Sequence, residues 1–162
     1  MNWEPFVLVE SGKRPDLVRS LDTLEGVGDR LRSAAFAEIQ AREAFLWAAS
    51  HFEEAPNDLR RAWTALAQAE QRHLDWLLTR MSELGVNVQE RRVSDHLWVS
   101  LKSCTSARNF AYFMANAEER GRQAGERFYR ALQVKDPITA EIFQKIAEEE
   151  IAHIALAKKF FP

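Results

Sequence analysis

The chain has 162 residues and a mass of 18.7 kDa, which fits one domain with a substantial core. Hydrophobic residues make up 46% and charged residues 28%, with only six glycines and five prolines, so disorder, collagen-like repeats and a turn-rich β fold are poor fits. The 22 Lys and Arg residues nearly balance the 24 Asp and Glu residues, and charge alone therefore indicates neither a nucleic-acid binder nor a binder of anionic membranes.

The only cysteine is Cys104, which excludes an internal disulfide and a cysteine-bound zinc or rubredoxin-like iron centre. The first residues lack the basic start and apolar stretch of a signal peptide, and no apolar run is long enough to span a bilayer. We therefore expect a soluble, cytoplasmic protein.

Proline and glycine interrupt residues 1–28, which we predict to form an extended amino-terminal arm with at most one short helical turn. Residues 29–162 are predicted to form the folded domain. Its first helix is predicted over residues 29–54, which are rich in Ala, Leu, Glu and Arg and contain no Pro or Gly.

Three further helices are predicted from their end signals. The second follows Pro56 and cap-forming polar residues, runs over 59–84 and stops at Gly85. After a long connection without helical periodicity, Thr105 or Ser106 caps the third helix, which continues to about residue 132. The fourth starts with an Asp-Pro cap and runs to the end of the chain. This order describes an all-α, ferritin-like four-helix bundle with a long crossover between the second and third helices.

Each predicted helix carries an apolar stripe at three- and four-residue steps that faces the core. Every stripe contains one glutamate, and the second helix of each pair adds a histidine three residues later. The six residues are Glu38, Glu70, His73, Glu118, Glu150 and His153. They repeat with an offset of 80 residues, so the two halves of the domain look like duplicated helical hairpins.

A spacing of three residues on a helix lets Glu and His reach one metal centre. Four carboxylates and two imidazoles are the ligand set of dinuclear carboxylate sites in bundles, and two divalent cations would neutralise carboxylates whose burial alone would be prohibitive. Hard oxygen ligands with imidazole favour two iron ions, with manganese or a mixed pair as the alternative. By analogy with such dinuclear sites, we assign Glu70 and Glu150 as the bridging ligands. Glu38 and His73 would complete one metal, and Glu118 and His153 the other.

Simpler interpretations exist for several residues. One Glu-x-x-His motif alone is a weak signal, and a satisfied polar core or a degenerate site is the alternative to metal binding. We reject Glu119, Glu148 and Glu149 as ligands because they lie off the stripes, and His51 and His96 because neither has an acidic partner at the right spacing.

Four other residues near the stripes allow two interpretations each. Arg42 and Arg122 can orient the carboxylates four residues before them or simply lie on a solvated face. Gly121 and Gly125 leave room for a small molecule or allow close helix packing.

The chain resembles the ferritin-like superfamily over about residues 34–161, and in particular a bacterial ferritin-like family designated a domain of unknown function. The motifs that carry the resemblance are Glu-Gln-Arg-His at 70–73, Glu-Leu-Gly at 83–85, Asp-His-Leu-Trp at 95–98, Glu-Glu-Arg-Gly at 118–121 and Glu-Glu-Ile-Ala-His at 149–153. Bacterioferritin-like chains carry a haem-ligating Met where this chain has Gln71, and rubrerythrin-like proteins add an iron domain that the lone Cys104 excludes. The related family pattern has a His where Phe36 stands.

The resemblance and the ligand set imply an O2-activating oxidase or hydroxylase with an unknown small-molecule substrate. The alternatives are an iron-handling ferroxidase or peroxidase and a non-catalytic helical interaction module. The expected partners are O2 or peroxide and the substrate, and an electron-donor protein and a homodimer are compatible with the sequence. Diiron tRNA hydroxylases are also similar, but only Arg60-Arg61 and Arg91-Arg92 offer basic clusters, so a nucleic-acid partner is not expected.

Overall fold

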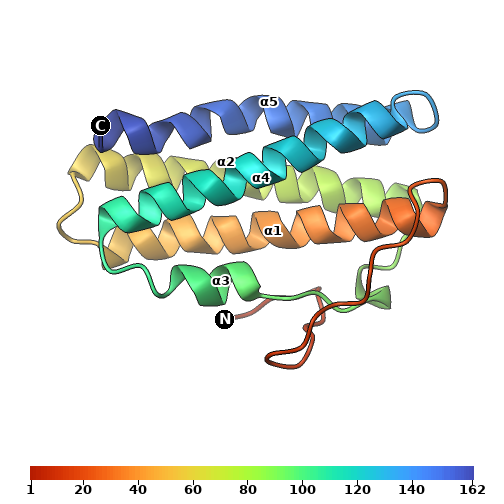
Figure 1. The fold of residues 1–162 in the computed structure, drawn as a ribbon, viewed down its shortest axis with the longest axis horizontal. Coiled ribbons are helices and arrows are strands. Elements are labelled where there is room, and N and C mark those ends of the chain that lie inside the picture. Colours follow the sequence, from red (N-terminus) through yellow and green to blue (C-terminus); the bar gives the residue numbers. More distant parts are fainter.

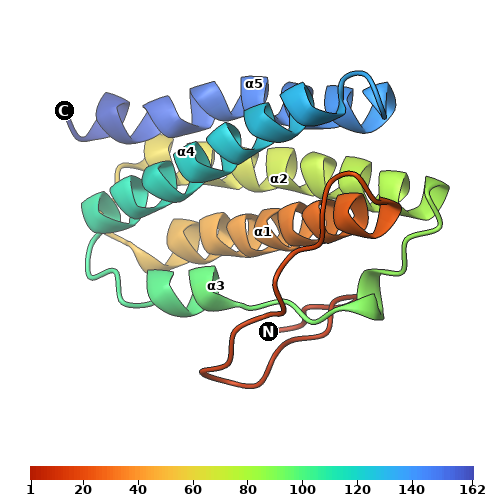
Figure 2. The ribbon, with the colours of Figure 1, turned by 45° about the vertical axis from the view of Figure 1, so that its right-hand side comes forward.

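Four long helices run along the molecule in two antiparallel hairpins, and a short fifth helix lies in the crossover that joins them (Figure 1). The computed structural model describes residues 1–162. The helices are α1 (Leu24–His51), α2 (Asn57–Glu83), α3 (His96–Leu101), α4 (Ala107–Leu132) and α5 (Pro137–Phe160), with a 3-10 turn η1 at Val88–Glu90. The view in Figure 2 shows the α1–α2 and α4–α5 hairpins side by side. The predicted all-α bundle with a long crossover is therefore confirmed.

The first helix begins earlier than predicted, at Leu24 instead of residue 29, and ends at His51 instead of residue 54. The two glycines that we interpreted as interruptions lie inside this helix. Other segments approach them too closely for any side chain, so only glycine fits at these positions. A Cβ on Gly26 would lie 1.7 Å from the backbone oxygen of residue 20, and one on Gly28 would lie 2.8 Å from the side chain of Val86. These glycines thus permit close packing around the start of α1.

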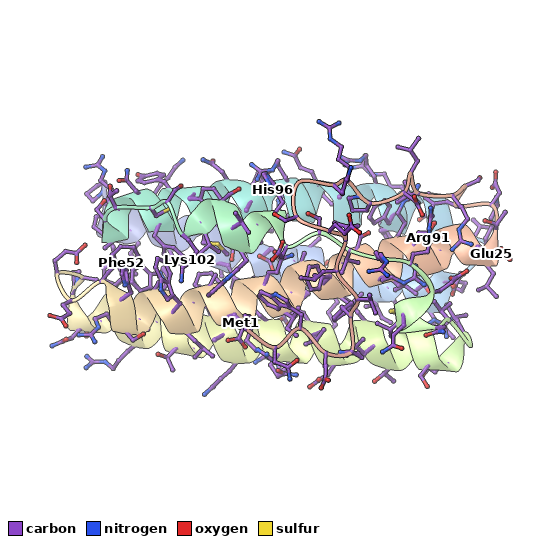
Figure 3. All side chains as sticks on the ribbon, turned by 90° about the horizontal axis from the view of Figure 1, so that it is seen from below. Met1, Glu25, Phe52, Arg91, His96 and Lys102 are labelled. Atoms are coloured by element: carbon purple, nitrogen blue, oxygen red, sulfur yellow. The ribbon has the colours of Figure 1, made fainter.

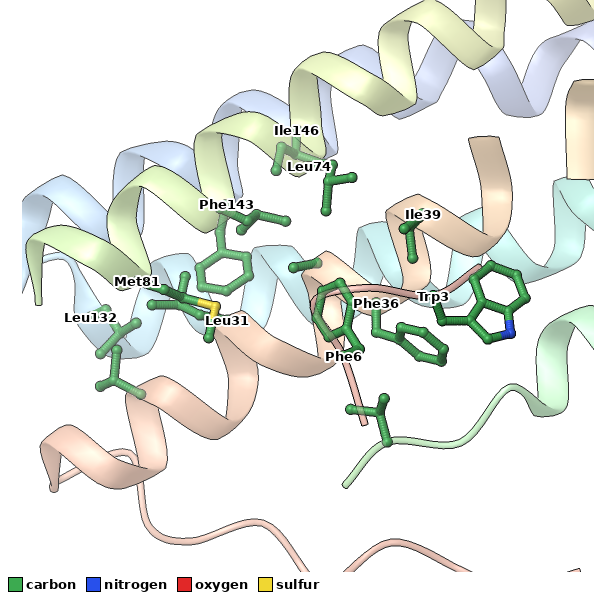
Figure 4. Close-up of a cluster of buried hydrophobic side chains, with 14 of the residues drawn as sticks. Trp3, Phe6, Leu31, Phe36, Ile39, Leu74, Met81, Leu132, Phe143 and Ile146 are labelled. Atoms are coloured by element: carbon green, nitrogen blue, oxygen red, sulfur yellow. The ribbon is translucent and has the colours of Figure 1, made fainter. Parts of the chain in front are cut away.

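Residues 1–23 pack against the bundle. Trp3 and Phe6 are buried, and their rings lie 5.5 Å and 5.0 Å from the ring of Phe36 in α1 (Figure 4). Val9 and Val93 join this segment to the crossover through a backbone hydrogen bond of 2.9 Å. The predicted extended arm is therefore irregular, as expected, but it forms part of the core of the first hairpin.

The ends of the other helices follow the predicted chemistry with one exception. Ser106 and Asp136 each accept a hydrogen bond from the backbone N–H three residues later, and Pro137 occupies the first turn of α5. Gly85 follows α2 with a φ of 68°, as expected for a glycine that ends a helix. The exception is the start of α2, where Pro56 is the cap residue and no side chain caps the helix.

The crossover returns along the bundle and is anchored by α3. Figure 3 shows α3, with His96 and Lys102 labelled at its two ends, against the face formed by α1 and α4. The backbone N–H of Trp98 donates to the side-chain oxygen of Gln40 at 3.0 Å, and Leu101 is fully buried. This contact holds the crossover over the gap between the two hairpins.

The core is divided into two apolar clusters, one toward each end of the bundle. One contains Leu31, Leu77 and Phe143, the other Phe45 and Trp63, and a polar layer lies between them. Helix α1 packs mainly along α2 and α4 mainly along α5, whereas α1 and α4 approach each other at few points. No helix is both long and apolar enough to cross a membrane.

Candidate metal centre

The six predicted ligands come together in the polar layer between the two apolar clusters. All four long helices contribute, α1 and α4 with one glutamate each and α2 and α5 with a glutamate and a histidine each. The side chains of Glu70 and His73 are 1% and 0% exposed. The side chain of Glu38, which faces His73, is 13% exposed. The pattern of apolar stripes with one carboxylate each has therefore placed the acidic groups deep inside the bundle.

One half of the centre surrounds the Nδ1 atom of His73. This atom lies 3.7 Å from Oε2 of Glu38, 3.5 Å from Oε2 of Glu70 and 3.4 Å from Oε1 of Glu150. One ligand atom from each of these four residues lies within 4.8 Å of the others, and such a group can hold a metal ion.

The other half surrounds the Nδ1 atom of His153, which lies 3.0 Å from Oε1 of Glu70 and 3.4 Å from Oε2 of Glu150. Together with Glu118 these residues form a second group within the same 4.8 Å limit. Glu70 and Glu150 belong to both groups, and each directs one carboxylate oxygen to each histidine. This grouping matches the assignment of bridging and outer ligands made by analogy with dinuclear sites; metal ligation by the six residues stays a prediction.

The donor atoms of this layer have no other partners. Five buried side-chain polar atoms lack a hydrogen bond, and all belong to the predicted ligands: Glu70 Oε1, His73 Nδ1, Glu118 Oε1, Glu150 Oε2 and His153 Nδ1. Each such group costs on the order of 1–3 kcal/mol if nothing satisfies it. Because the atoms are donors to cations and converge in two groups, the residues fit a pair of metal ions.

The pKa values show how the centre carries its charge without cations. Burial and the charge of Glu70 raise the pKa of Glu38 well above its usual value, and burial with the charges of Glu150 and Glu70 does the same for Glu118. Burial opposes ionisation of Glu70 too, but the imidazoles of His153 and His73 hold its pKa at about 2. Burial lowers the imidazole pKa values, yet the facing carboxylates raise that of His153 to about 10. Without cations, protons held on the outer glutamates and the histidines balance the negative charge of this cluster, and two metal cations would take their place.

Glu149, which lies outside both ligand groups, supports one of the histidines. Its Oε2 lies 2.9 Å from Nε2 of His73 and 3.4 Å from a guanidinium nitrogen of Arg72. An acceptor on Nε2 fixes the imidazole with Nδ1 toward the centre. His153 has no such partner, and position 69, the repeat equivalent of Glu149, is Ala69. Helix periodicity does not reveal this role because the contact joins α5 to α2; the only signal in the sequence is an acidic residue directly before Glu150.

The two arginines that follow the outer glutamates do not contact them. Arg42 pairs with Glu43 at 2.5 Å, and Arg122 pairs with Glu119 at 2.8 Å. The contact that the orienting interpretation requires is therefore absent, and both side chains lie partly buried, 24% and 21% exposed.

The two remaining histidines lie outside the centre, as expected. His51 is exposed and stacks on Trp47 with ring centroids 4.4 Å apart, and His96 is exposed at the start of α3.

A cavity of about 280 Å³ opens between α1 and α4 and reaches the centre. All four glutamates of the centre line it, and Phe143 and Ile146 bound it on the α5 side. A Cβ on Gly121 would meet no atom within 4 Å, so this position provides room, as one interpretation predicted. A Cβ on Gly125 would lie 3.3 Å from the backbone oxygen of Phe143, so close helix packing explains that glycine.

Comparisons with known proteins agree with this architecture. Among solved structures, the chain is similar to a dodecameric thioferritin, the bacterioferritin-related protein from Bacteroides fragilis, with a TM-score of 0.72 and 19% identity over 85% of each chain. This likeness confirms the ferritin-like fold. No curated protein matches the sequence. Residues 5–162 match the model of a family described as a protein of unknown function (DUF455). The chain therefore belongs to the DUF455 family and has a ferritin-like fold with a buried Glu/His group that can bind metal.

Proposed function

We propose that this protein binds two iron ions at the six-residue centre and uses O2 to oxidise a small organic molecule held in the adjoining cavity. The observation that carries the proposal is the contact between the cavity and the glutamates of both ligand groups. A centre that only stored charge or stabilised the bundle would need no such space. The cavity instead gives a small molecule access to both halves of the centre.

The residues have separable tasks in this proposal. Bound iron would supply the redox chemistry and the activation of O2. Glu70 and Glu150 hold the two halves together, each with one carboxylate oxygen toward each histidine, while Glu149 fixes the ring of His73. Met114, Phe143 and Ile146 line the cavity with apolar surface, which excludes water from a substrate placed there.

The electron balance defines what else the reaction needs. Insertion of one oxygen atom of O2 into a C–H bond leaves the second atom to be reduced to water, which consumes two electrons and two protons. These electrons come from a donor, for which an electron-donor protein is the expected class. Hydrogen peroxide already carries both electrons and would replace O2 and the donor together.

Iron counting and O2 consumption test the proposal. Protein purified without added metal and then loaded anaerobically with Fe²⁺ is expected to hold two ions per chain and to consume O2 in the presence of a reductant. Glu150→Ala is expected to abolish both, whereas Glu148→Ala, two residues away and exposed, should change neither. Absence of iron, or iron without reaction with O2 or peroxide, would refute the proposal. Anomalous scattering at the iron edge would separate iron from manganese.

Iron handling is the second candidate, and the structural likeness favours it. The similar thioferritin from Bacteroides fragilis is dodecameric. A shell of many copies of this chain that oxidises Fe²⁺ and retains the product would support ferroxidase or storage activity. A monomer or dimer that couples O2 consumption to oxidation of an organic molecule supports the oxidase. A chain that binds no metal would be the non-catalytic helical module.

A further inference from the structure

One end of the cavity carries a cationic side chain that no acid neutralises. Arg30 lines the cavity, donates a hydrogen bond of 2.9 Å to the backbone oxygen of Arg19, and lies 5.9 Å from the ring of Phe128. No Asp or Glu forms an ion pair with it. The other arginine in the lining, Arg122, differs because Glu119 and a second glutamate of its own helix hold it. Arg30 is therefore the free positive charge of this cavity.

Ser33 adds a hydroxyl group to the same end. It lies three residues after Arg30 on α1, lines the cavity and is exposed, and its hydroxyl forms no hydrogen bond within the chain. Residues three apart share one face of a helix, so the guanidinium and the hydroxyl can contact one group. Guanidinium recognises carboxylates through paired N–H donors. A carboxylate is thus the group that this end is built to bind.

The walls between Arg30 and the centre are apolar and narrow. Small side chains line both facing helices, which leaves space where larger ones would close the bundle. They are Ala34, Ala37 and Ala41 of α1 and Ala117, Gly121, Ala124 and Gly125 of α4. A volume of about 280 Å³ lies at the small end of the usual range for ligand sites. The body of the ligand is therefore apolar and slender.

The helix rise sets the length of that body. Arg30 precedes Glu38 by eight residues, which corresponds to roughly 12 Å along α1. An extended hydrocarbon chain advances roughly 1.3 Å per carbon atom, so about ten atoms span this interval. The orientation follows from charge, because four carboxylates lie at the far end and the free cation lies at the near end.

We propose that the cavity binds a small amphipathic carboxylate whose acid group contacts Arg30 and Ser33 and whose apolar end lies at Glu38 and Glu118. The inference rests on the proposed function, since it names the substrate class of that centre. The site of oxidation would accordingly lie near the end of the chain remote from the carboxylate.

Calorimetric binding of decanoate and of 1-decanol tests this assignment on both metal-free and iron-loaded protein. Decanoate is expected to bind with one molecule per chain. Arg30→Gln should weaken decanoate at least tenfold and change decanol less than twofold, and Arg30→Lys should retain most of the affinity. Gly121→Leu, which fills the cavity, should weaken both probes at least tenfold.

Two variants of α4 serve as matched controls. Arg127→Gln removes an exposed arginine outside the cavity, and Ala131→Leu adds a leucine side chain to the exposed face of the same helix; both should bind decanoate like the natural chain. Thermal unfolding of every variant identifies any that fails to fold.

The failure of this inference is distinguishable from failure of the proposed function. Two bound irons and O2 consumption without decanoate binding at about 1 mM would overturn only the ligand assignment. The same conclusion would follow if decanoate bound to Arg30→Gln and to Gly121→Leu as tightly as to the natural chain. Decanoate binding that depends on Arg30, in a chain that takes up no iron, would overturn only the proposed function.

Discussion

The α1–α2 and α4–α5 hairpins bring the same set of predicted ligands to the centre but surround them differently. Around the first hairpin, the amino-terminal segment and the crossover are tied to α1 through Asp29, which is 3% exposed and pairs with Arg19, Arg32 and Arg91. The repeat equivalent in the second hairpin is the exposed Asn109, and no segment wraps that hairpin in the same way. The duplicated pattern thus specifies the ligands, whereas the unduplicated segments specify the environment.

The difference makes the centre asymmetric. His73 is fully buried and has Glu149 on its outer nitrogen, whereas His153 is 8% exposed and has no such partner. Between α1 and α4 the asymmetry concerns space, because Gly121 stands where the first hairpin has Ala41. One half of the centre is therefore held more firmly, and the face between α1 and α4 remains open to a small molecule.

Substitution of a shared ligand should have the largest effect. Glu70 contributes an oxygen to both halves, so Glu70→Ala is expected to reduce the iron content from two ions per chain to none. Glu118 belongs to one half only, and Glu118→Ala should leave one ion, bound at the His73 half. Elemental analysis of the purified variants gives these numbers directly. Equal losses in the two variants would contradict the partition between shared and outer ligands.

Removal of the Asp29 charge should destabilise the fold rather than the centre. Burial disfavours ionisation of Asp29, but hydrogen bonds and charges from Arg19 and Arg91 hold its pKa well below the usual value. Asp29→Asn removes the one buried carboxylate that these arginines share with the buried Arg32 and leaves only their pairs with the more exposed Glu90 and Asp16. We expect the free energy of unfolding to fall by about 3 kcal/mol at pH 7. Chemical denaturation of the natural chain and of Asp29→Asn, at the same iron content, would measure this difference in the free energy of unfolding.

The pH dependence of this effect has a definite sign. Because the pKa of Asp29 is lower in the folded chain than in the unfolded chain, its stabilisation is complete above the unfolded value, near pH 4, and is lost as the pH falls toward the folded value. The difference between the natural chain and Asp29→Asn should therefore shrink below about pH 4. The exposed Asp22, paired with Lys135, is the control, and Asp22→Asn should lower the free energy of unfolding far less, because solvent screens an exposed ion pair. A loss of similar size at both positions would rule out a special role for Asp29.

Glu149 should influence only one of the two ions. Without its carboxylate the ring of His73 is free to turn, so Glu149→Ala is expected to weaken iron binding at that half by roughly 10- to 100-fold and to leave the His153 half unchanged. Glu149→Gln retains an acceptor and should restore part of the affinity. Iron titrations would show one weakened phase and one unchanged phase. Uniform weakening of both phases would assign Glu149 a general electrostatic effect.

These tests also separate what the sequence could predict from what it could not. The ligands and the fold follow from local spacing, because a three-residue step and an offset of 80 residues repeat independently of any other contact. The start of α1 was mispredicted because Gly26 and Gly28 break helices by propensity, and only the approach of neighbouring segments explains their use. The contact of Glu149 and the free charge of Arg30 likewise arise between elements, where periodicity carries no information.

The smallest expected effect concerns Gly121, the glycine of α4 that leaves room in the cavity between α1 and α4. Gly121→Ala makes α4 resemble α1 at this position, and the added methyl group meets nothing within 4 Å, so the variant should gain up to about 1 kcal/mol from helix propensity alone. Gly125→Ala places its methyl group 3.3 Å from the backbone oxygen of Phe143 and should gain little or lose stability. Thermal unfolding of both metal-free variants distinguishes the two sites. A loss of stability at Gly121 would mean that α1 and α4 pack there, in which case the open face of the centre would not exist.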